Sequence, residues 1–255
     1  MDEKQGALSD SGGPLAPTPS RYSFASRVLD IFIEPKKVFD YLRDRGDFWR
    51  PYIFHAVILM VVTCLALPAV KQVSSEYAGL MGRSTPPEVG LTDYLMTPVQ
   101  VAAGLAISFA VLGFVIWLAV LISSGKARYG QALSLAAYTF FPVLLAKVIN
   151  GITLMITRPS LGDPSVMMVT QAPVINYTSL AQLFAGRPIL QTSLLPVGIF
   201  TLWALYLLVI GLRRSANVSM VAAWVTALSL LVVQVGLYAL MAFGMAMSLK
   251  AVGAG

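Results

Sequence analysis

Five long runs of apolar residues dominate the chain from residue 51 onward. A helix needs about 20 residues to cross roughly 30 Å of bilayer hydrocarbon, and these runs are close to that length or longer. They do not alternate between apolar and polar positions, as the strands of a membrane barrel would. The pattern therefore predicts an all-α integral membrane protein, a bundle of five transmembrane helices. The predicted spans are 51–70, 98–123, 131–157, 194–212 and 218–249.

The first 50 residues have a different character. Residues 1–20 are rich in Gly, Pro and Ser and contain no apolar run, so a disordered tail is predicted. The chain starts with MDEK and continues with polar residues where a signal peptide would have its apolar stretch, so no signal peptide is expected. The predicted organisation is a tail over 1–20, interfacial helices over 21–50 and a membrane domain over 51–249.

Two short amphipathic surface helices are predicted in the second of these segments, over about 22–33 and 35–44. Their apolar residues recur at helical spacing, and Pro35 suits the first position of a helix, where its missing N–H costs nothing. The apolar stripe is expected to face either the acyl chains at the membrane surface or the protein bundle. Both interpretations remain open from the sequence. The apolar residues are Phe24, Val28, Ile31, Phe32, Val38, Phe39 and Leu42.

Composition supports a membrane protein and excludes other classes. The chain has 57% hydrophobic and 12% charged residues, whereas a soluble domain has about 45–50% and about 25%. So few charges could not cover the surface of a soluble enzyme of this size, and a disordered chain would be less apolar.

The basic residues predict an orientation. If the N-terminus is cytoplasmic, segments 1–50, 124–130 and 213–217 hold 12 of the 18 Lys and Arg residues, and the outer segments hold five. Cytoplasmic loops of membrane proteins carry such an excess. Five spans then place the C-terminus outside. The net charge of +6 is thereby mostly a topology signal, and no nucleic-acid partner is expected.

Polar residues within spans are candidate functional positions. Lys147 is the one charged residue in a predicted span, and it shares a helix face with Asn150 and Gly151. Two interpretations stay open: Lys147 lies near the outer boundary and extends to water, or it contacts a solute or a lipid headgroup. Gln234 in the last span is expected to join two helices by a hydrogen bond, worth about 0.6 kcal/mol on average.

A proline marks the third predicted span. Pro142 removes a backbone hydrogen bond and is expected to kink the helix, which frees the carbonyl of Tyr138 four residues earlier. Such a kink serves packing or shapes a cavity.

The outer connection 158–193 is long and almost without charge. We expect it to pack against the outer membrane surface or against the bundle. Connections of this length are often functional.

No catalytic pattern is present in the sequence. It contains no HExxH, no GxSxG and no phosphate-binding glycine loop. One Cys, Cys64, and one His, His55, provide neither an intrachain disulfide nor the four ligands of a structural zinc site. We expect no enzymatic activity, no cofactor and no metal.

Two stretches resemble a known family. The first is Ser26-Arg27-Val28-Leu29-Asp30-Ile31-Phe32-Ile33-Glu34-Pro35-Lys36-Lys37-Val38-Phe39, followed by the aromatic-proline entry Asp47-Phe48-Trp49-Arg50-Pro51. The second is Gly125-Lys126-Ala127-Arg128-Tyr129-Gly130-Gln131-Ala132-Leu133 with Ala137-Tyr138-Thr139-Phe140-Phe141-Pro142. Together, over about residues 25–245, they resemble the bacterial branch of the Yip-one domain family, also called the Ypt/Rab-interacting protein family.

The resemblance implies five spans with a cytosolic N-terminus. Eukaryotic relatives act in the early secretory pathway, engage Rab-type GTPases and help to organise membranes. They carry an Asp-Leu-Tyr-Gly-Pro stretch before the first span, whereas this chain has Ile33-Glu34-Pro35, so GTPase binding is not implied here. The bacterial-type motifs favour a bacterial plasma membrane, with an early secretory membrane as the alternative.

Two functions are carried forward from the sequence. The first is a non-enzymatic membrane protein that organises membrane or docks a protein partner or larger membrane complex, with the lipid bilayer as its environment. The second is a small-solute or lipid transporter that uses the face of Lys147 and Asn150 and the kink at Pro142. The candidate functional or packing positions are Pro35, Tyr138, Pro142, Lys147, Asn150 and Gln234.

Overall fold

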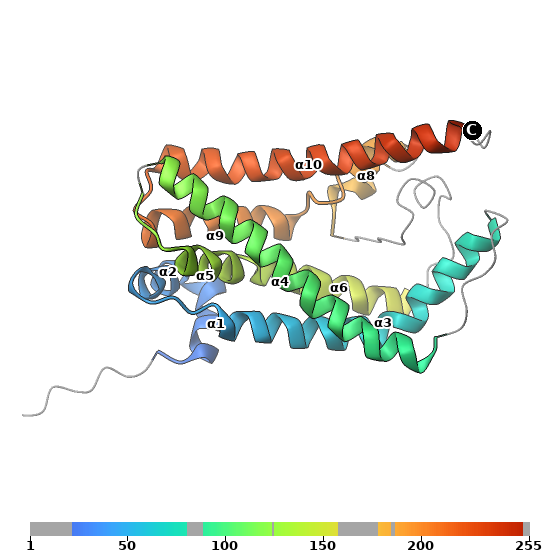
Figure 1. Cartoon of the computed structure of the whole chain (residues 1–255), viewed down its shortest axis with the longest axis horizontal. Helices are drawn as coiled ribbons and strands as arrows, with labels where there is room; N and C mark the ends of the chain where they lie inside the picture. The colour runs from blue at the N-terminus through green and yellow to red at the C-terminus, as the bar shows by residue number, and fades with distance from the viewer. Residues whose placement is uncertain (1–21, 81–88, 124, 158–177, 185–186, 252–255) are drawn as a thin grey trace, which may run out of the picture.

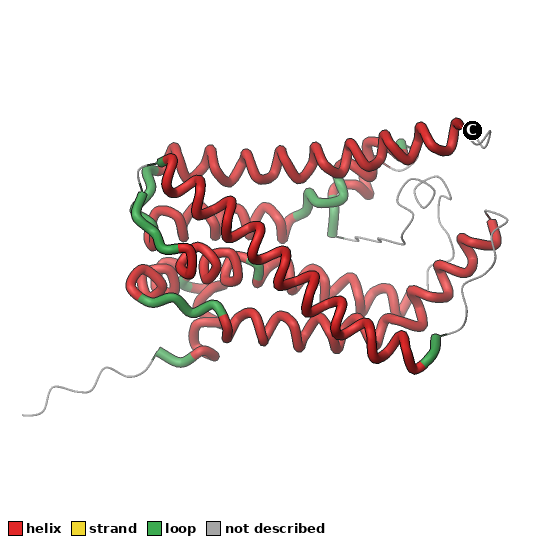
Figure 2. The backbone as a smooth tube through the Cα atoms, viewed as in Figure 1, coloured by secondary structure: helices red, strands yellow, loops and turns green. Residues whose placement is uncertain are grey.

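The computed structural model describes residues 22–80, 89–123, 125–157, 178–184 and 187–251, and this part of the chain consists of helices and their connections (Figures 1 and 2). The long helices lie lengthwise in one bundle, and the two short N-terminal helices cover one end of it (Figure 1). The elements are α1 (Phe24–Ile33), α2 (Pro35–Asp44), α3 (Trp49–Leu80), α4 (Leu91–Ile122), α5 (Tyr129–Thr139), α6 (Phe141–Thr157), η1 (Leu180–Phe184), α8 (Pro188–Ser193), α9 (Ile199–Ser215) and α10 (Met220–Ala251).

Within the described residues, four helical stretches are long and apolar enough to cross a membrane. They correspond to the first, second, third and fifth predicted spans. The fourth predicted span corresponds to α9, which has 17 residues and is shorter than the other four. A count of five crossing helices is therefore not established by helix length. The four stretches are Trp49–Gln72, Leu91–Ile122, Tyr129–Ile156 and Met220–Gly244.

The start of α9 corrects a predicted boundary. The sequence predicts a span from residue 194, but the helix begins at Ile199. Pro196 has no backbone donor and interrupts the apolar run, and Gly198 is the N-cap in an extended conformation. Hydropathy alone does not register either effect.

The third predicted span is divided into two helices. The helix α5 ends at Thr139, Phe140 lies between, and α6 starts at Phe141. Pro142 is thus the second residue of α6, where a helix needs no N–H donor from the proline. The break lies where the sequence predicts a kink, and it is limited to Phe140, whose backbone stays in the right-handed helical region.

The N-terminal pair α1 and α2 packs into the bundle. Ile31, Val38 and Phe39 are fully buried and join the main hydrophobic core. On α9, Gly211 leaves room for Phe39, because a Cβ there would lie 3.0 Å from Phe39 Cε1. One apolar face of the pair therefore faces protein. Leu29 and Ile33 on α1 remain exposed.

The opposite end of the bundle has its own ion pair. Lys71 Nζ lies 3.4 Å from Asp93 Oδ1 and joins α3 to α4. Asp93 also accepts a hydrogen bond from the backbone N–H of Gly90, 2.9 Å away, and so caps the start of α4.

Part of the long outer connection is described. It forms η1 and α8, and α8 contacts α10. Ser179, Gln191 and Thr192 are buried there, so this portion packs against the bundle. The predicted tail over 1–20 and residues 158–177 and 185–186 of the predicted loop lie outside the described residues.

Candidate functional site

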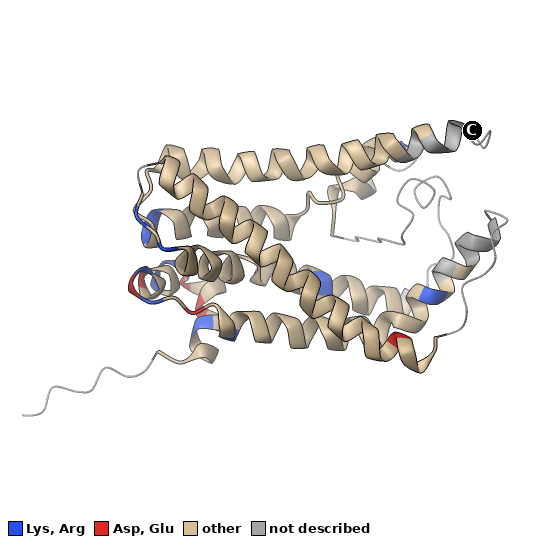
Figure 3. Cartoon of the chain, viewed as in Figure 1, with Lys and Arg blue, Asp and Glu red and all other residues tan. Residues whose placement is uncertain are grey.

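Charged side chains gather at the end of the bundle that α1 and α2 cover (Figure 3). Several contacts join the connections at this end. Arg43 Nε donates to the carbonyl of Arg214 at 3.2 Å, and the N–H of Lys126 donates to the carbonyl of Ala216 at 3.2 Å. Gln131 Nε2 donates to the carbonyl of Arg43. The short connections that the sequence predicts on the N-terminal side are therefore neighbours in space.

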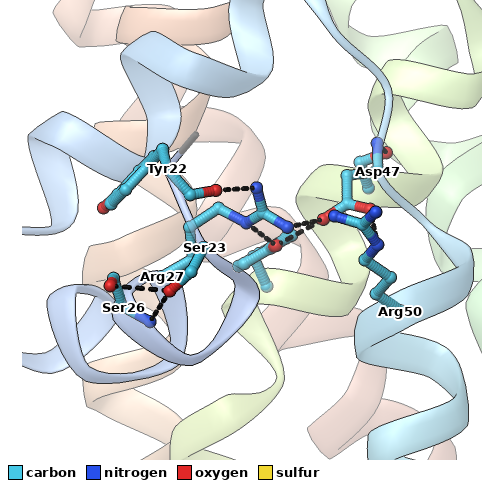
Figure 4. Close-up of polar contacts among 8 residues, drawn as sticks. Tyr22, Ser23, Ser26, Arg27, Asp47 and Arg50 are labelled. Carbon is cyan, nitrogen blue, oxygen red and sulfur yellow. Dashed lines mark hydrogen bonds and ion pairs between the residues drawn. The ribbon is translucent and has the colours of Figure 1, made fainter. Parts of the chain in front are cut away.

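A buried arginine lies at the centre of this end. Arg27 comes from α1, which starts after the N-cap Ser23, and its side chain is 0% exposed. Its Nη1 donates to the carbonyl of Tyr22 at 2.9 Å, and its Nη2 lies 2.9 Å from Asp47 Oδ2 (Figure 4). Its Nε donates to the hydroxyl of Tyr138 at 2.9 Å. A buried charge is tolerated only with such partners.

The two main partners of Arg27 also contact each other. The hydroxyl of Tyr138 donates to Asp47 Oδ2 at 2.7 Å, so Arg27, Asp47 and Tyr138 form a closed triangle. The backbone N–H of Asp47 donates to Ser134 Oγ at 2.9 Å. Helix α1, the connection between α2 and α3, and helix α5 are thus joined at one point, which we call the Arg27 cluster (Arg27, Asp47 and Tyr138).

Aromatic rings enclose the guanidinium group. Arg27 Cζ lies 4.7 Å from the centre of the Tyr41 ring, and 5.8 Å from the centres of the Tyr22 and Phe24 rings. Cations over such rings gain electrostatic stabilisation, which is larger when the site is shielded from water. Phe24 is on α1, Tyr41 is on α2, and Tyr22 lies two residues before α1, so the same cation also joins α1 to α2.

A second, more exposed set of charges joins the same two helices. Tyr22 donates from its hydroxyl to Asp30 Oδ2 at 2.6 Å, and Lys37 Nζ lies 2.8 Å from the same oxygen. The hydrogen bonds from Lys37 and Tyr22 lower the pKa of Asp30, and Asp30 in turn raises the pKa of Lys37. Burial, and then the hydrogen bond to Asp30, raise the pKa of Tyr22.

These shifts predict a pH dependence of the contact between α1 and α2. The pKa of Asp30 is lowered on folding from its ordinary value of 3.8. The contribution of Asp30 to the stability of the α1–α2 contact is therefore complete above that ordinary value, and it is lost as the pH falls through the lowered pKa. Glu34, 3.9 Å from Lys37, and Arg27 are the other charges near this set. The protection of the α1 amides against hydrogen exchange, taken as the measured rate relative to the intrinsic rate at each pH, is expected to fall at the acid end, and Asp30→Asn should remove part of that pH dependence. Asp40→Asn, on the outer side of α2, should leave it intact; equal profiles for the two variants would contradict the assignment.

The candidate positions from the sequence do not form one site in the structure. Pro35 is the first residue of α2, and Tyr138 and Pro142 flank the helix break, with Tyr138 fully buried in the Arg27 cluster. Lys147 is exposed on α6, and Asn150 beside it is partly buried. Gln234 is exposed on α10, where no hydrogen bond of its side chain is recorded within the described residues. The structure therefore brings Tyr138 into a polar cluster and leaves Lys147 and Gln234 outside it.

Sequence reasoning missed Arg27 and Asp47 as members of a site. One signal for Arg27 was present: it follows Phe24 by three residues and precedes Ile31 by four, so it lies on the apolar stripe of its helix. A charge in that position requires a buried partner. The sequence drew attention to the carbonyl of Tyr138, whereas the structure uses its hydroxyl.

The Arg27 cluster consists of structural contacts that hold helices together. The guanidinium, carboxylate and phenol contact one another, and these contacts join α1, the connection between α2 and α3, and α5. Among the described residues, no three His, Cys, Asp or Glu side chains come together in a way that could hold a metal ion.

The fold defines a multi-pass helical membrane protein with an N-terminal helical pair fastened to one end. Residues 29–243 match the Yip1 domain, and the chain belongs to this family, as its two motifs predict. The chain is 25% identical over 207 residues to the membrane protein YknW of Bacillus subtilis (strain 168). The aligned region covers 80% of this chain and 84% of the relative. No solved structure gives a significant match. The Yip1 domain family is not known for enzymatic activity.

Proposed function

We propose that this protein is a non-enzymatic organiser of a membrane that docks a protein partner or larger membrane complex on its α1–α2 pair. The observation that carries the proposal is the complete burial of Arg27. Its contacts fix α1 and α2 relative to the bundle, so the pair presents a surface of constant shape. A surface that is already ordered binds a partner without the cost of ordering it.

The outer side of α2 supplies groups for such a contact. It carries both signs of charge on exposed side chains, which favours a polar, electrostatically selected partner. None of these side chains belongs to the Arg27 cluster, although Lys37 pairs with Asp30, Asp40 pairs with Arg214, and Arg43 donates to the carbonyl of Arg214. The exposed charged residues are Lys36, Lys37, Asp40, Arg43 and Asp44.

The proposed membrane arrangement has five spans, with α9 as the fourth. Helix α9 contacts α6 and α10, two helices that include crossing stretches, and ends with Arg213 and Arg214. The surplus of basic residues on the side of α1 and α2 supports a cytoplasmic N-terminus and an external C-terminus. We propose a bacterial plasma membrane as its location; what supports a bacterial membrane is the similarity to a membrane protein of Bacillus subtilis (strain 168).

Transport is not favoured as the function. The transport hypothesis requires Lys147 and Asn150 to line a path for a solute. Lys147 is exposed on α6, and no ion pair of Lys147 is recorded within the described residues. An exposed lysine of this kind can extend to the membrane boundary.

Site-specific photocrosslinking in the native membrane tests the docking proposal. A photoreactive side chain at Asp44, exposed on α2, is expected to give a discrete adduct with one protein partner. The same side chain at Val232, exposed on the lipid-facing helix α10, is the control and is expected to give no such adduct. The proposal is wrong if neither Asp44 nor the neighbouring exposed positions of α2 give an adduct, or if Val232 gives the same one.

A further inference from the structure

A groove lies where the turn between α1 and α2 meets α9. Its volume is about 610 Å³. One side is formed by the end of α1 and the start of α2, and the other by the second half of α9. The lining residues are Ile33, Glu34, Pro35, Lys36, Lys37, Asp40, Tyr206 and Ile210.

The wall of the groove on α9 is apolar and continues along the helix. Tyr206 is 50% exposed, and Leu202 and Ile199, four and seven residues before it, are also exposed. Residues at this spacing share one face of a helix. On the opposite wall, Ile33 is 75% exposed. The groove therefore opens onto an apolar stripe of α9 long enough to accompany an acyl chain.

The other end of the groove is lined by charges of both signs, Glu34 and Asp40 as well as Lys36 and Lys37. Lys37 is paired with Asp30 at 2.8 Å and Asp40 with Arg214 at 3.7 Å. Lys36 also lines the groove, and no ion pair of Lys36 is recorded in the described part of the chain. The same holds there for Arg213, which is exposed seven residues after Tyr206 and so lies on the same face of α9.

We propose that this groove binds one anionic phospholipid, with its phosphate between Lys36 and Arg213 and an acyl chain along Ile33 and Tyr206. The inference rests on α9 lying in the membrane, as proposed above. The cation and the apolar residues follow one another along α9 as the headgroup and the acyl chain do in a phospholipid. Arg213 is near the end of the helix, and Tyr206 is about 10 Å further toward the helix start, at a rise of 1.5 Å per residue. A soluble phosphate would leave the apolar wall unused. With a neutral lipid, the two cations Lys36 and Arg213 would outnumber Glu34, the lining carboxylate that no close ion pair occupies.

Native mass spectrometry of the full-length protein in mild detergent tests this inference, with phosphatidylglycerol as the titrated lipid. Lys36→Glu and Arg213→Glu each change the local charge by two units, so each is expected to weaken binding roughly thirtyfold, at about fivefold for each unit of charge near an anionic headgroup. Lys126→Glu is the matched control, because Lys126 is exposed at the same end of the bundle but outside the groove. It should change binding less than twofold. Equal losses for Lys36→Glu and Lys126→Glu would overturn the proposal.

Further measurements test the class of ligand and the role of the apolar wall. Tyr206→Ser, at an exposed position that keeps the fold, should weaken phosphatidylglycerol binding, and phosphatidylcholine should bind the unchanged protein less tightly. Glycerol 1-phosphate, the headgroup chemistry without acyl chains, should not compete. Competition by glycerol 1-phosphate, or equal binding of the two lipids, would show that the groove is not a site for an anionic phospholipid. Lipid binding and the crosslink at Asp44 are separate readouts, so either can fail while the other holds.

Discussion

Replacement of Arg27 by alanine is expected to cause the largest loss of stability of any single change in the N-terminal pair. The substitution leaves the carboxylate of Asp47, which is 13% exposed, and the hydroxyl of Tyr138 without their shared partner. Removal of one member of a buried ion pair costs about 3–5 kcal/mol. Thermal unfolding of the purified protein in a bilayer nanodisc measures the effect.

Arg50→Ala is the matched control for this prediction. Arg50 also approaches Asp47, with Nε 4.0 Å from Oδ1, but its side chain is 63% exposed. An exposed ion pair contributes at most about 1 kcal/mol, so the unfolding temperature should change little. If the two variants unfold alike, burial of Arg27 is not what stabilises this end of the molecule.

Replacement of Tyr138 by phenylalanine is expected to have the second largest effect. The ring remains, but Arg27 Nε loses its acceptor and Asp47 Oδ2 loses a donor. A buried polar group without a partner costs about 1–3 kcal/mol. The loss should be non-additive with that of Arg27→Ala, because both changes act on one cluster. A double-mutant cycle in thermal or chemical unfolding gives the coupling energy.

Tyr129→Phe provides the comparison on the same helix. The Tyr129 hydroxyl donates to the carbonyl of Ala110 at 3.0 Å, and this residue is 39% exposed. Water or lipid headgroups can replace an exposed hydrogen bond, so its loss should cost less than about 1 kcal/mol. A cost for Tyr138→Phe no larger than this, or strict additivity with Arg27→Ala, would contradict the triangle of contacts.

The long helices and the short N-terminal pair could be predicted because their signals are local. The helices α3, α4 and α10 each contain an apolar stretch that suffices to cross a bilayer. Helix α1 buries Ile31, helix α2 buries Val38, Phe39 and Leu42, and Pro35 marks the start of the second. The family could also be predicted, because its motifs are continuous in sequence.

The length of α9 could not be predicted from hydropathy, since Leu194, Leu195 and Val197 are as apolar as the helix that follows. Backbone chemistry at Pro196 and Gly198 sets the helix start instead. The choice between lipid and protein for the apolar face of α1 and α2 was equally open in the sequence, because Phe39 would suit either. The close approach to Gly211 on α9, far away in the chain, decides it for α2.

The Arg27 cluster depends on contacts between residues that are distant in sequence. Arg27 and Tyr138 are 111 residues apart, and Tyr138 and Asp47 are 91 apart. Each residue alone has an ordinary interpretation: a surface arginine, a loop aspartate and a tyrosine within a span. Only the packing of α1 on α5 turns them into one buried group. Lys147, which stands out in the sequence as a lone charge in a span, is outside this group.

Hydrogen exchange of α1 in the full-length protein tests the central claim most directly, because it measures whether the N-terminal pair is fastened to the bundle. The amides of α1 are expected to exchange as slowly as those of α5 in the unchanged protein. Exchange of α1 should accelerate at least about tenfold in Arg27→Ala and remain unchanged in Arg50→Ala. Rapid exchange of α1 in the unchanged protein, or the same acceleration in both variants, would contradict the account.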